Sequence, residues 1–472
     1  MKITNFLLVL ICFLFCLGLT VNNVKAQSFV SGLLLTVDNN GDSVDINQGD
    51  GICADASGQC TLRAALQEAN ANPSGDAINF TLPQPSVINL TLGQLQITAS
   101  VAIVGPGARR LTVERSFNSG TPDFRIFDVS RNAGTSISIR GLTIKNGNAG
   151  EQLLGGGIYI EQDNNVIVND VAISNNSATV GGGIFNAGNL NLTRSLVNSN
   201  SAGSRGGAIV NLDGLSAATV SNSTITNNSA LTSGAIDNGA SLLLINDTIT
   251  GNSAANAASS IFNNPNGTIN VLNTIIGNDA ATNVTTLSGA FNSLGNNLIT
   301  DARDSTGFTN GVNNDQVSNN NAINPLLGDL ADNGGQTDTR NLQTGSPAIN
   351  AGNNCVFTRP CSSPIPSNIL LRSDQRYGYS RLTGDSVDIG AFETGATISN
   401  SSGSLILGLL GFSHRQVRAI AILTNARTGE KTYRVSNVFG SIIFQNLAGN
   451  EVYILEIQSK GVSFPSPRVF EF

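Results

Sequence analysis

The feature that most constrains the fold is a phrase that recurs in the middle of the chain at steps of 24 to 28 residues. In each copy a turn of small residues precedes an isoleucine, and in most copies an asparagine follows two positions later. The isoleucines are Ile158, Ile184, Ile209, Ile236 and Ile261, and the asparagines are Asn186, Asn211, Asn238 and Asn263. A period of this length is typical of a solenoid, in which each repeat stacks on its neighbours.

Within each repeat, apolar and polar residues alternate over short runs such as "NLNLTRSLV" and "TINVLNTII". Alternation with a period of two indicates strands, and no helical period runs through this region. A repeat of about 25 residues that holds three short strands fits one coil of a parallel β-helix, with coils about 4.8 Å apart. We therefore expect columns of Ile and Val in the interior, glycine at sharp corners, and a ladder of asparagine side chains from coil to coil.

The expected fold class is all-β: a right-handed parallel β-helix of the pectin-lyase-like kind, with three strands per coil and a short N-terminal capping helix. A small antiparallel β-sandwich follows it. The coils are expected over residues 76–290, where "GGAI" begins at Gly206 and "FNA" and "FNN" begin at Phe185 and Phe262. These elements resemble the repeat of chlamydial polymorphic outer-membrane proteins. The resemblance implies a surface-exposed β-helix, often an adhesin.

Residues 1–26 have the form of a secretory signal peptide. Lys2 gives a positive start, "FLLVLICFLFCLGL" is apolar, and "VKA" precedes Gln27. An uncleaved anchor is the less favoured alternative, because the apolar run is short for a membrane span. We expect a secreted or cell-surface protein with no transmembrane span after cleavage.

Four cysteines follow the signal peptide, as two close pairs: Cys53 with Cys60, and Cys355 with Cys361. An even number in an exported chain suggests disulfides, and local pairing is the simplest of the three connectivities. A zinc site is less favoured because no histidine lies near either pair. We expect no bound metal and no cofactor.

Residues 27–75 are expected to cap the first coil, because an uncovered sheet edge invites aggregation. The segment from Leu62 to Ala69 has helical spacing and good helix formers. It follows "CTLRAA" at Cys60 to Ala65, which resembles the CSLREA domain at the start of secreted bacterial β-helical proteins. Ala64 stands where that family has Glu, so the resemblance implies the capping role without the acidic side chain.

An acidic run, "DNNGDSVDINQGDG", precedes this helix and holds Asp38, Asp42, Asp45 and Asp50. Clustered carboxylates are calcium ligands in many proteins. The favoured interpretation is a solvated turn, because Ser43 and Gly49 stand where a calcium-binding EF-hand loop needs Gly and Glu.

Residues 291–394 carry two long motifs, "NPLLGDLADNGGQTDTRNLQTGSPAINAGN" and "DQRYGYSRLTGDSVDIGAFE". The pair resembles the choice-of-anchor Q domain, with Arg340 where that family has His. The resemblance implies the final coils and the C-terminal cap of the β-helix. We predict that Arg376, Asp388 and Glu393 form buried ion pairs and turns there, because no nucleophile or metal site accompanies them.

Residues 397–472 contain short apolar runs about every ten residues, which indicates an antiparallel β-sandwich. The stretch "SNVFGSIIFQNLAGNEVYILEIQSKGVSFPSPRVFEF" resembles the carboxypeptidase regulatory-like domain. Such domains are spacers or stability modules. The single histidine, His414, lies in a loop of this region and is not expected to be catalytic.

Few residues suggest chemistry. A net charge of -7 over 472 residues argues against a nucleic-acid partner. A β-helix lyase would need clustered acids and a basic residue, and the candidates in the coils are Asp170, Asp213, Asp237, Asp247, Lys145, Arg194 and Arg205. They fall in different registers of the repeat. The absence of Trp and the presence of five Tyr leave few aromatic platforms for sugars.

The expected function is that of an exported, non-catalytic cell-surface or extracellular β-helix protein, adhesin-like or structural. Its expected partner is a glycan or another cell-surface ligand. The alternative is a carbohydrate-active enzyme, either a polysaccharide lyase or a glycoside hydrolase, of the same fold. Two or three carboxylates that converge within about 10 Å in a cleft would favour the enzyme.

Overall fold

The computed structural model describes most of the chain beyond the predicted signal peptide. It covers residues 32–396, except 130–133, 151–153, 257, 259, 278–286, 320–322, 359–360, 362 and 367–368. It also covers 403–408, 419–435, 441–447, 452–459 and 468–471. The predicted signal peptide, residues 1–26, and His414 lie outside the described residues.

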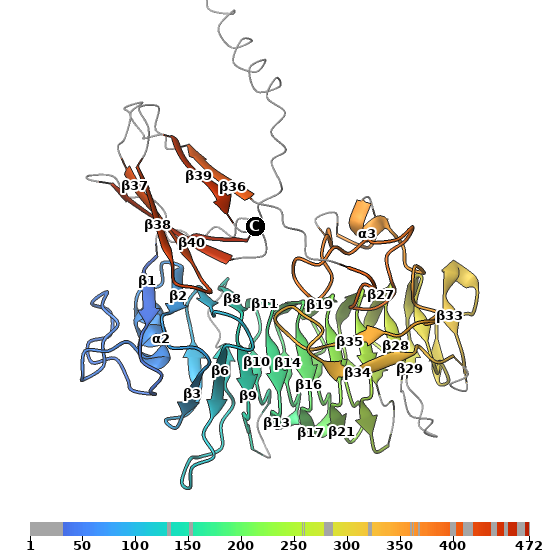
Figure 1. The fold of residues 1–472 in the computed structure, drawn as a ribbon. Helices are drawn as coiled ribbons and strands as arrows, with labels where there is room; N and C mark the ends of the chain where they lie inside the picture. Colours follow the sequence, from blue (N-terminus) through green and yellow to red (C-terminus); the bar gives the residue numbers. More distant parts are fainter. Residues whose placement is uncertain are drawn as a thin grey trace, which may run out of the picture.

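Parallel strands in the described residues stack into the three long sheets of a β-helix, which confirms the expected fold class (Figure 1). Sheet 1 contains β1 (Leu34–Val37), β2 (Asp76–Phe80), β5 (Val101–Val104), β8 (Ser136–Arg140), β11 (Asn165–Asn169), β15 (Asn189–Thr193), β19 (Ala217–Ser221), β23 (Ser241–Ile245), β27 (Thr268–Leu272) and β30 (Asn292–Gly295). Sheet 2 contains β3 (Ser86–Leu90), β6 (Leu111–Arg115), β9 (Thr143–Lys145), β12 (Ala172–Ser174), β16 (Leu196–Asn198), β20 (Thr224–Thr226), β24 (Thr248–Thr250), β28 (Ile275–Gly277), β31 (Leu298–Ile299) and β33 (Gln316–Val317). Sheet 3 contains β4 (Leu95–Ile97), β7 (Phe127–Val129), β10 (Ile158–Ile160), β14 (Ile184–Asn186), β18 (Ile209–Asn211), β22 (Ile236–Asn238), β26 (Ile261–Asn263), β29 (Leu287–Ala290) and β32 (Ser305–Thr306).

A fourth, shorter sheet runs beside the middle coils. Sheet 4 contains β13 (Ser177–Val180), β17 (Ser201–Arg205), β21 (Ser229–Ala230) and β25 (Ser253–Ala254). Its strands begin at the "SA" of the repeated "NNSA" phrase, so the same repeat specifies this additional strand.

The repeated isoleucines form one interior column, as predicted. Ile158 pairs with Ile184, which pairs with Ile209, and the register continues through Ile236 to Ile261. Each is at most 1% exposed. Burial of apolar surface at every coil therefore stabilises the stack, at roughly 25 cal/mol per Å².

Two ladders of buried asparagines run along the interior. In the inner ladder, each side-chain nitrogen of Asn186, Asn211 and Asn238 donates to the next side-chain oxygen, ending at Asn263, at 2.7 to 2.8 Å. This ladder was predicted. A second ladder, the corner ladder, was not predicted, although its residues precede the "SA" of the repeated phrase. Each side-chain nitrogen of Asn176, Asn200 and Asn228 donates to the next side-chain oxygen, ending at Asn252, at 2.9 to 3.0 Å.

Asparagine also occupies corners where glycine was expected. The corner after sheet 1 has positive φ in successive coils, and its residues are Asp170, Arg194, Asn222, Asn246, Asn273 and Asn296. Asn and Asp tolerate this left-handed conformation better than most residues. Glycine holds the corner before sheet 3, at Gly155, Gly181 and Gly206. A Cβ on the adjacent Gly182 would lie 2.4 Å from the carbonyl oxygen of Ser201, so close packing of coils also requires glycine.

The N-terminal end is covered by the predicted capping helix, α2 (Leu62–Ala71). Thr61 caps it by accepting a hydrogen bond from Ala64 N. Polar side chains of this region also bind the backbone of edge strands: Arg63 and Asn70 donate to carbonyls of Gln94 and Gln96 next to and within β4. These contacts block the open edge of sheet 3.

The returning segment, residues 323–396, follows the last coils and packs along the side of the β-helix (Figure 1, orange). It contains β34 (Leu327–Ala331) and β35 (Thr339–Leu342), an antiparallel pair, and the short α3 (Cys355–Thr358); the 3-10 helix η1 (Val312–Asn314) precedes it. Its Val356, Ile365, Leu371 and Val387 cover Leu243, Ile245 and Leu272 on the outer face of sheet 1. The final coils and a C-terminal cap were expected for residues 291–394. Strands β30 to β33 do continue the coils, and the later part of this region packs along the flank.

Corner asparagines dock this segment. Asn222 donates its side-chain NH to the carbonyl of Ser373 at 2.8 Å. Asn273 both donates to the carbonyl of Asn353 and accepts from its backbone N–H, at 3.1 and 2.7 Å. The left-handed corner points these amides outward. The returning segment therefore follows the row of corners after sheet 1.

The C-terminal strands form a small antiparallel sandwich of two sheets. One sheet pairs β36 (Gly403–Gly408) with β39 (Ser441–Leu447). The other contains β38 (Lys431–Val435), β37 (Ala419–Asn425), β40 (Val452–Ser459) and β41 (Arg468–Glu471). Ala426 and Ile454 pack against Ala77, Ala102 and Val104 of the first coils, beside the blue end in Figure 1. Among the described residues, no helix is both long and apolar enough to cross a membrane.

Candidate functional site

The acidic residues weighed as lyase candidates have separate structural partners. Asp170 pairs with Arg194 through two contacts of 2.9 Å at the corner after sheet 1. Asp237 lies on sheet 3 and pairs with Arg205 at 3.0 Å. The two pairs lie on different parts of the coil, one at the corner after sheet 1 and the other on sheet 3.

Asp247 is fully buried behind the corner of sheet 1. Its carboxylate accepts from the backbone N–H groups of Ser223 and Ile245, at 2.9 and 3.0 Å. Burial raises the pKa of Asp247 well above its usual value. Two candidates remain. Asp213 is exposed after β18, and Lys145 is half-buried on sheet 2.

The residues of the second C-terminal motif form a buried polar network, in which the ion pair of Arg376 is made with Asp374, while Asp388 and Glu393 accept from backbone N–H groups. Arg376 pairs with Asp374 at 2.6 Å, and its guanidinium lies 3.7 Å from the ring centre of Phe392. Asp388 accepts from the backbone N–H of Asn350 at 2.7 Å. These groups hold the turns of the returning segment together.

Glu393 accepts the backbone N–H groups of Asp388 and Thr383, at 2.9 and 3.2 Å. Burial raises the pKa of Glu393 to about 7. Sequence reasoning missed Arg381, which is fully buried and donates to the carbonyls of Asp388 and Gly390. No motif or repeat position indicates that this arginine is buried.

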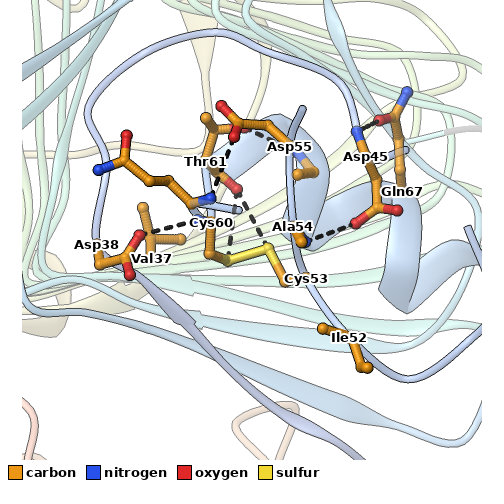
Figure 2. The surroundings of a disulfide bond; sticks show 12 residues. Val37, Asp38, Asp45, Ile52, Cys53, Ala54, Asp55, Cys60, Thr61 and Gln67 are labelled. Atoms are coloured by element: carbon orange, nitrogen blue, oxygen red, sulfur yellow. Dashed lines mark hydrogen bonds between the residues drawn. A yellow bond between two sulfur atoms is a disulfide. The ribbon is translucent and has the colours of Figure 1, made fainter. Parts of the chain in front are cut away.

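Both expected disulfides are present: Cys53 bonds to Cys60 and Cys355 bonds to Cys361. Figure 2 shows the first of them beside the start of α2. The second closes the loop after α3, and its sulfurs contribute to the apolar cluster over sheet 1. The first bond joins the loop before α2 to the residue that precedes the helix N-cap, and the second joins α3 to the segment after it.

The acidic run before the helix organises the cap through its carboxylates. Asp38 accepts from Cys60 N at 2.8 Å, and Asp45 accepts from Ala54 N at 3.0 Å (Figure 2). Asp42 pairs with Arg63 at 2.8 Å. The favoured interpretation, a solvated turn, is wrong for Asp42 and Asp45, whose carboxylates are buried. Among the described residues, no group of three or more His, Cys, Asp or Glu side chains is placed to hold a metal ion.

The outer face of sheet 3 carries a column that sequence reasoning missed. The residue after each repeated isoleucine points outward, and the paired positions are Tyr159, Phe185, Val210, Asp237 and Phe262. Tyr159 and Phe185 stack with ring centres 5.6 Å apart. Arg125 lies over the Tyr159 ring at 4.4 Å and pairs with Asp128 at 3.2 Å. Burial raises the pKa of the Tyr159 hydroxyl.

A polar groove continues from this column toward the N-terminal cap. It lies between α2 and β4 and has a volume of about 640 Å³. Gln94 connects the two features, because it lines the groove and donates to Asp128 at 3.2 Å. The groove and the adjacent part of sheet 3 together form the candidate binding surface.

Comparisons of the chain with models of known protein families and with curated proteins find no match.

Proposed function

We propose that this protein is an exported, non-catalytic β-helix that acts at the cell surface or outside the cell, as an adhesin-like or structural protein. The observation that carries the proposal is that the acids weighed for catalysis serve the fold. Asp170 and Asp237 are held in ion pairs, and Asp247 and Glu393 bind backbone N–H groups in the interior.

The solvent-facing positions of the coils support a binding or structural role. Sheet 1 exposes Asn165, Asn189, Ser241 and Thr268 in one register, and sheet 4 exposes Ser201 and Ser253. Such a face is polar and uncharged, so it suits contact with hydroxyl-rich surfaces. The two disulfides agree with an oxidising, extracellular location.

The resemblance of the repeats to chlamydial surface proteins, and of residues 27–75 and 291–394 to the CSLREA and choice-of-anchor Q domains, points the same way. In this proposal the C-terminal sandwich is a spacer that packs against the first coils. The predicted signal peptide would direct export, after which the chain from Gln27 onward forms the mature protein.

The test measures adhesion and turnover on the same purified protein. We expect it to bind cells or immobilised glycans and to leave pectin-like polymers intact, measured by the absorbance of unsaturated products and by reducing ends. Release of either product would instead establish the alternative, a carbohydrate-active enzyme. Asp170→Asn and Asp237→Asn should leave binding unchanged if these acids are structural.

A further inference from the structure

The groove between α2 and β4 is unusual in its lining. Ligand sites are typically apolar with a few polar groups, and their volumes are roughly 300 to 1,000 Å³. This groove has a suitable volume, about 640 Å³, but its lining is dominated by amides. The uncharged polar lining residues are Gln48, Gln67, Asn70, Gln94, Gln96 and Thr98. A matching ligand must therefore carry many polar groups.

Part of the lining is fixed in place. Asn70 bridges the edge strand by donating to the carbonyl of Gln96 at 2.9 Å and accepting from Thr98 N at 2.8 Å. Gln94 is held by Asp128. A rigid lining lowers the entropic cost of binding.

Other amides are open to a ligand. In the described part of the chain, the side chains of Gln48 and Gln96 make no hydrogen bond, and both residues are exposed. Gln67 also lines the groove and uses its oxygen to accept from Asp45 N at 2.8 Å. An amide both donates and accepts, as does a sugar hydroxyl, so these groups are complementary to a carbohydrate.

The charges near the groove are internally balanced. Arg63 is the ionisable residue of its lining, and it pairs with Asp42 while donating to the carbonyls of Gly93 and Gln94. At the sheet 3 end, Arg125 balances Asp128. An acidic or basic ligand would find no unpaired partner among these groups.

The rim also offers apolar contact. Leu92 lines the groove and is 61% exposed. Beyond Gln94, the half-buried Tyr159 lies on the outer face of sheet 3, with Arg125 over its ring and the Phe185 ring stacked against it. Sugars expose C–H faces as well as hydroxyls, and such a face can pack on the exposed Leu92 side chain.

We propose that this groove binds a short, uncharged oligosaccharide. The inference rests on the proposed function, because it names the ligand class and the site of the adhesive surface. The open amides hydrogen bond to the sugar hydroxyls, Leu92 contacts a C–H face, and a longer glycan extends along sheet 3 toward Tyr159.

The test is calorimetric titration of the purified protein with uncharged trisaccharides of glucose, galactose and N-acetylglucosamine, and with acidic trigalacturonate. We expect at least one uncharged trisaccharide to bind more tightly than trigalacturonate, with equal affinity at pH 5 and pH 8. Gln96→Ala and Gln48→Ala should each weaken binding about three- to tenfold, as expected for one lost hydrogen bond. The control Asn266→Ala removes an exposed amide in the loop after β26 and should leave the affinity for the trisaccharide unchanged.

These variants should keep the wild-type urea midpoint, since the two glutamine side chains make no hydrogen bond within the described residues. Failure of every uncharged trisaccharide to bind at millimolar concentration would overturn the inference, as would tighter binding of trigalacturonate or wild-type affinity in Gln96→Ala. If the protein still adheres to cells when one of these results is found, the groove is not the binding site but the proposed adhesive function stands. Product release in the turnover assay would instead overturn the proposed function.

Discussion

Replacing Asn211 with alanine removes a central member of the inner asparagine ladder. The Asn211 Nδ2 atom donates to Asn238 Oδ1 at 2.7 Å and to the carbonyl of Ser241 at 3.0 Å. Its Oδ1 atom accepts from Asn186 Nδ2 at 2.8 Å. The residue is 1% exposed, so water cannot replace these hydrogen bonds without opening the coil.

The expected magnitude follows from the groups left behind. Asn238 Oδ1 and the Ser241 carbonyl lose a donor, whereas Asn186 Nδ2 loses one acceptor but keeps the carbonyl of Ala217 at 3.0 Å. A buried polar group without a partner costs about 1 to 3 kcal/mol. Two such groups, partly relieved by relaxation, should lower the free energy of unfolding by about 3 kcal/mol.

Urea unfolding followed by far-ultraviolet circular dichroism measures this difference. The matched control is Asn189→Ala, because Asn189 also donates to the equivalent residue one coil away, Asn165, but on the exposed face of sheet 1. The control should change stability by less than about 0.5 kcal/mol. Equal effects of the two substitutions would refute the view that the buried ladder stabilises the stack.

Three further predictions concern the cap, the corners and pH. Burial raises the pKa of Glu393 from 4.5 to about 7, so the folded state binds this proton more tightly than the unfolded chain. Protonated Glu393 contributes fully to the free energy of unfolding below pH 4.5, and this contribution declines by about 3 kcal/mol as pH rises through 7. Urea midpoints measured from pH 4 to 8 should show the decline. The Glu393→Gln variant should show a smaller decline. Asn222→Ala should destabilise the protein by about 1 kcal/mol more than Asn227→Ala, because both corners have positive φ but only Asn222 docks the returning segment; equal urea midpoints would contradict this. Removing the first disulfide with Cys53→Ala and Cys60→Ala should cost about 2 to 3 kcal/mol and speed amide exchange in the cap; unchanged exchange would show that the bond does not hold the cap.

The stacked core was predictable because it depends on local repetition. Each repeat must match its neighbours wherever their side chains touch, so the isoleucine column and the inner ladder are visible in the sequence. The corner ladder and the outward column obey the same rule. They were missed although Asn200 and Tyr159 occupy fixed positions of the repeated phrases.

The docking of the returning segment and the groove could not be read from the repeat. Asn222 meets Ser373 across 151 residues, and Asn273 meets Asn353 across 80. No period links such positions, and the corner asparagines look the same whether or not a segment covers them. The groove likewise depends on how α2 lies over β4, which no single motif specifies.

The central claim is that successive coils lie in register, and distances between spin labels on one exposed column test it most directly. Ser136, Asn165, Asn189, Ala217, Ser241 and Thr268 are consecutive partners along sheet 1. Cysteine labels at Ser136 and Ser241 should be about 19 Å apart, and labels at Ser136 and Thr268 about 5 Å farther, because each coil adds about 4.8 Å. Equal distances for the two pairs, or distances that do not grow with the number of coils, would contradict the stacked register.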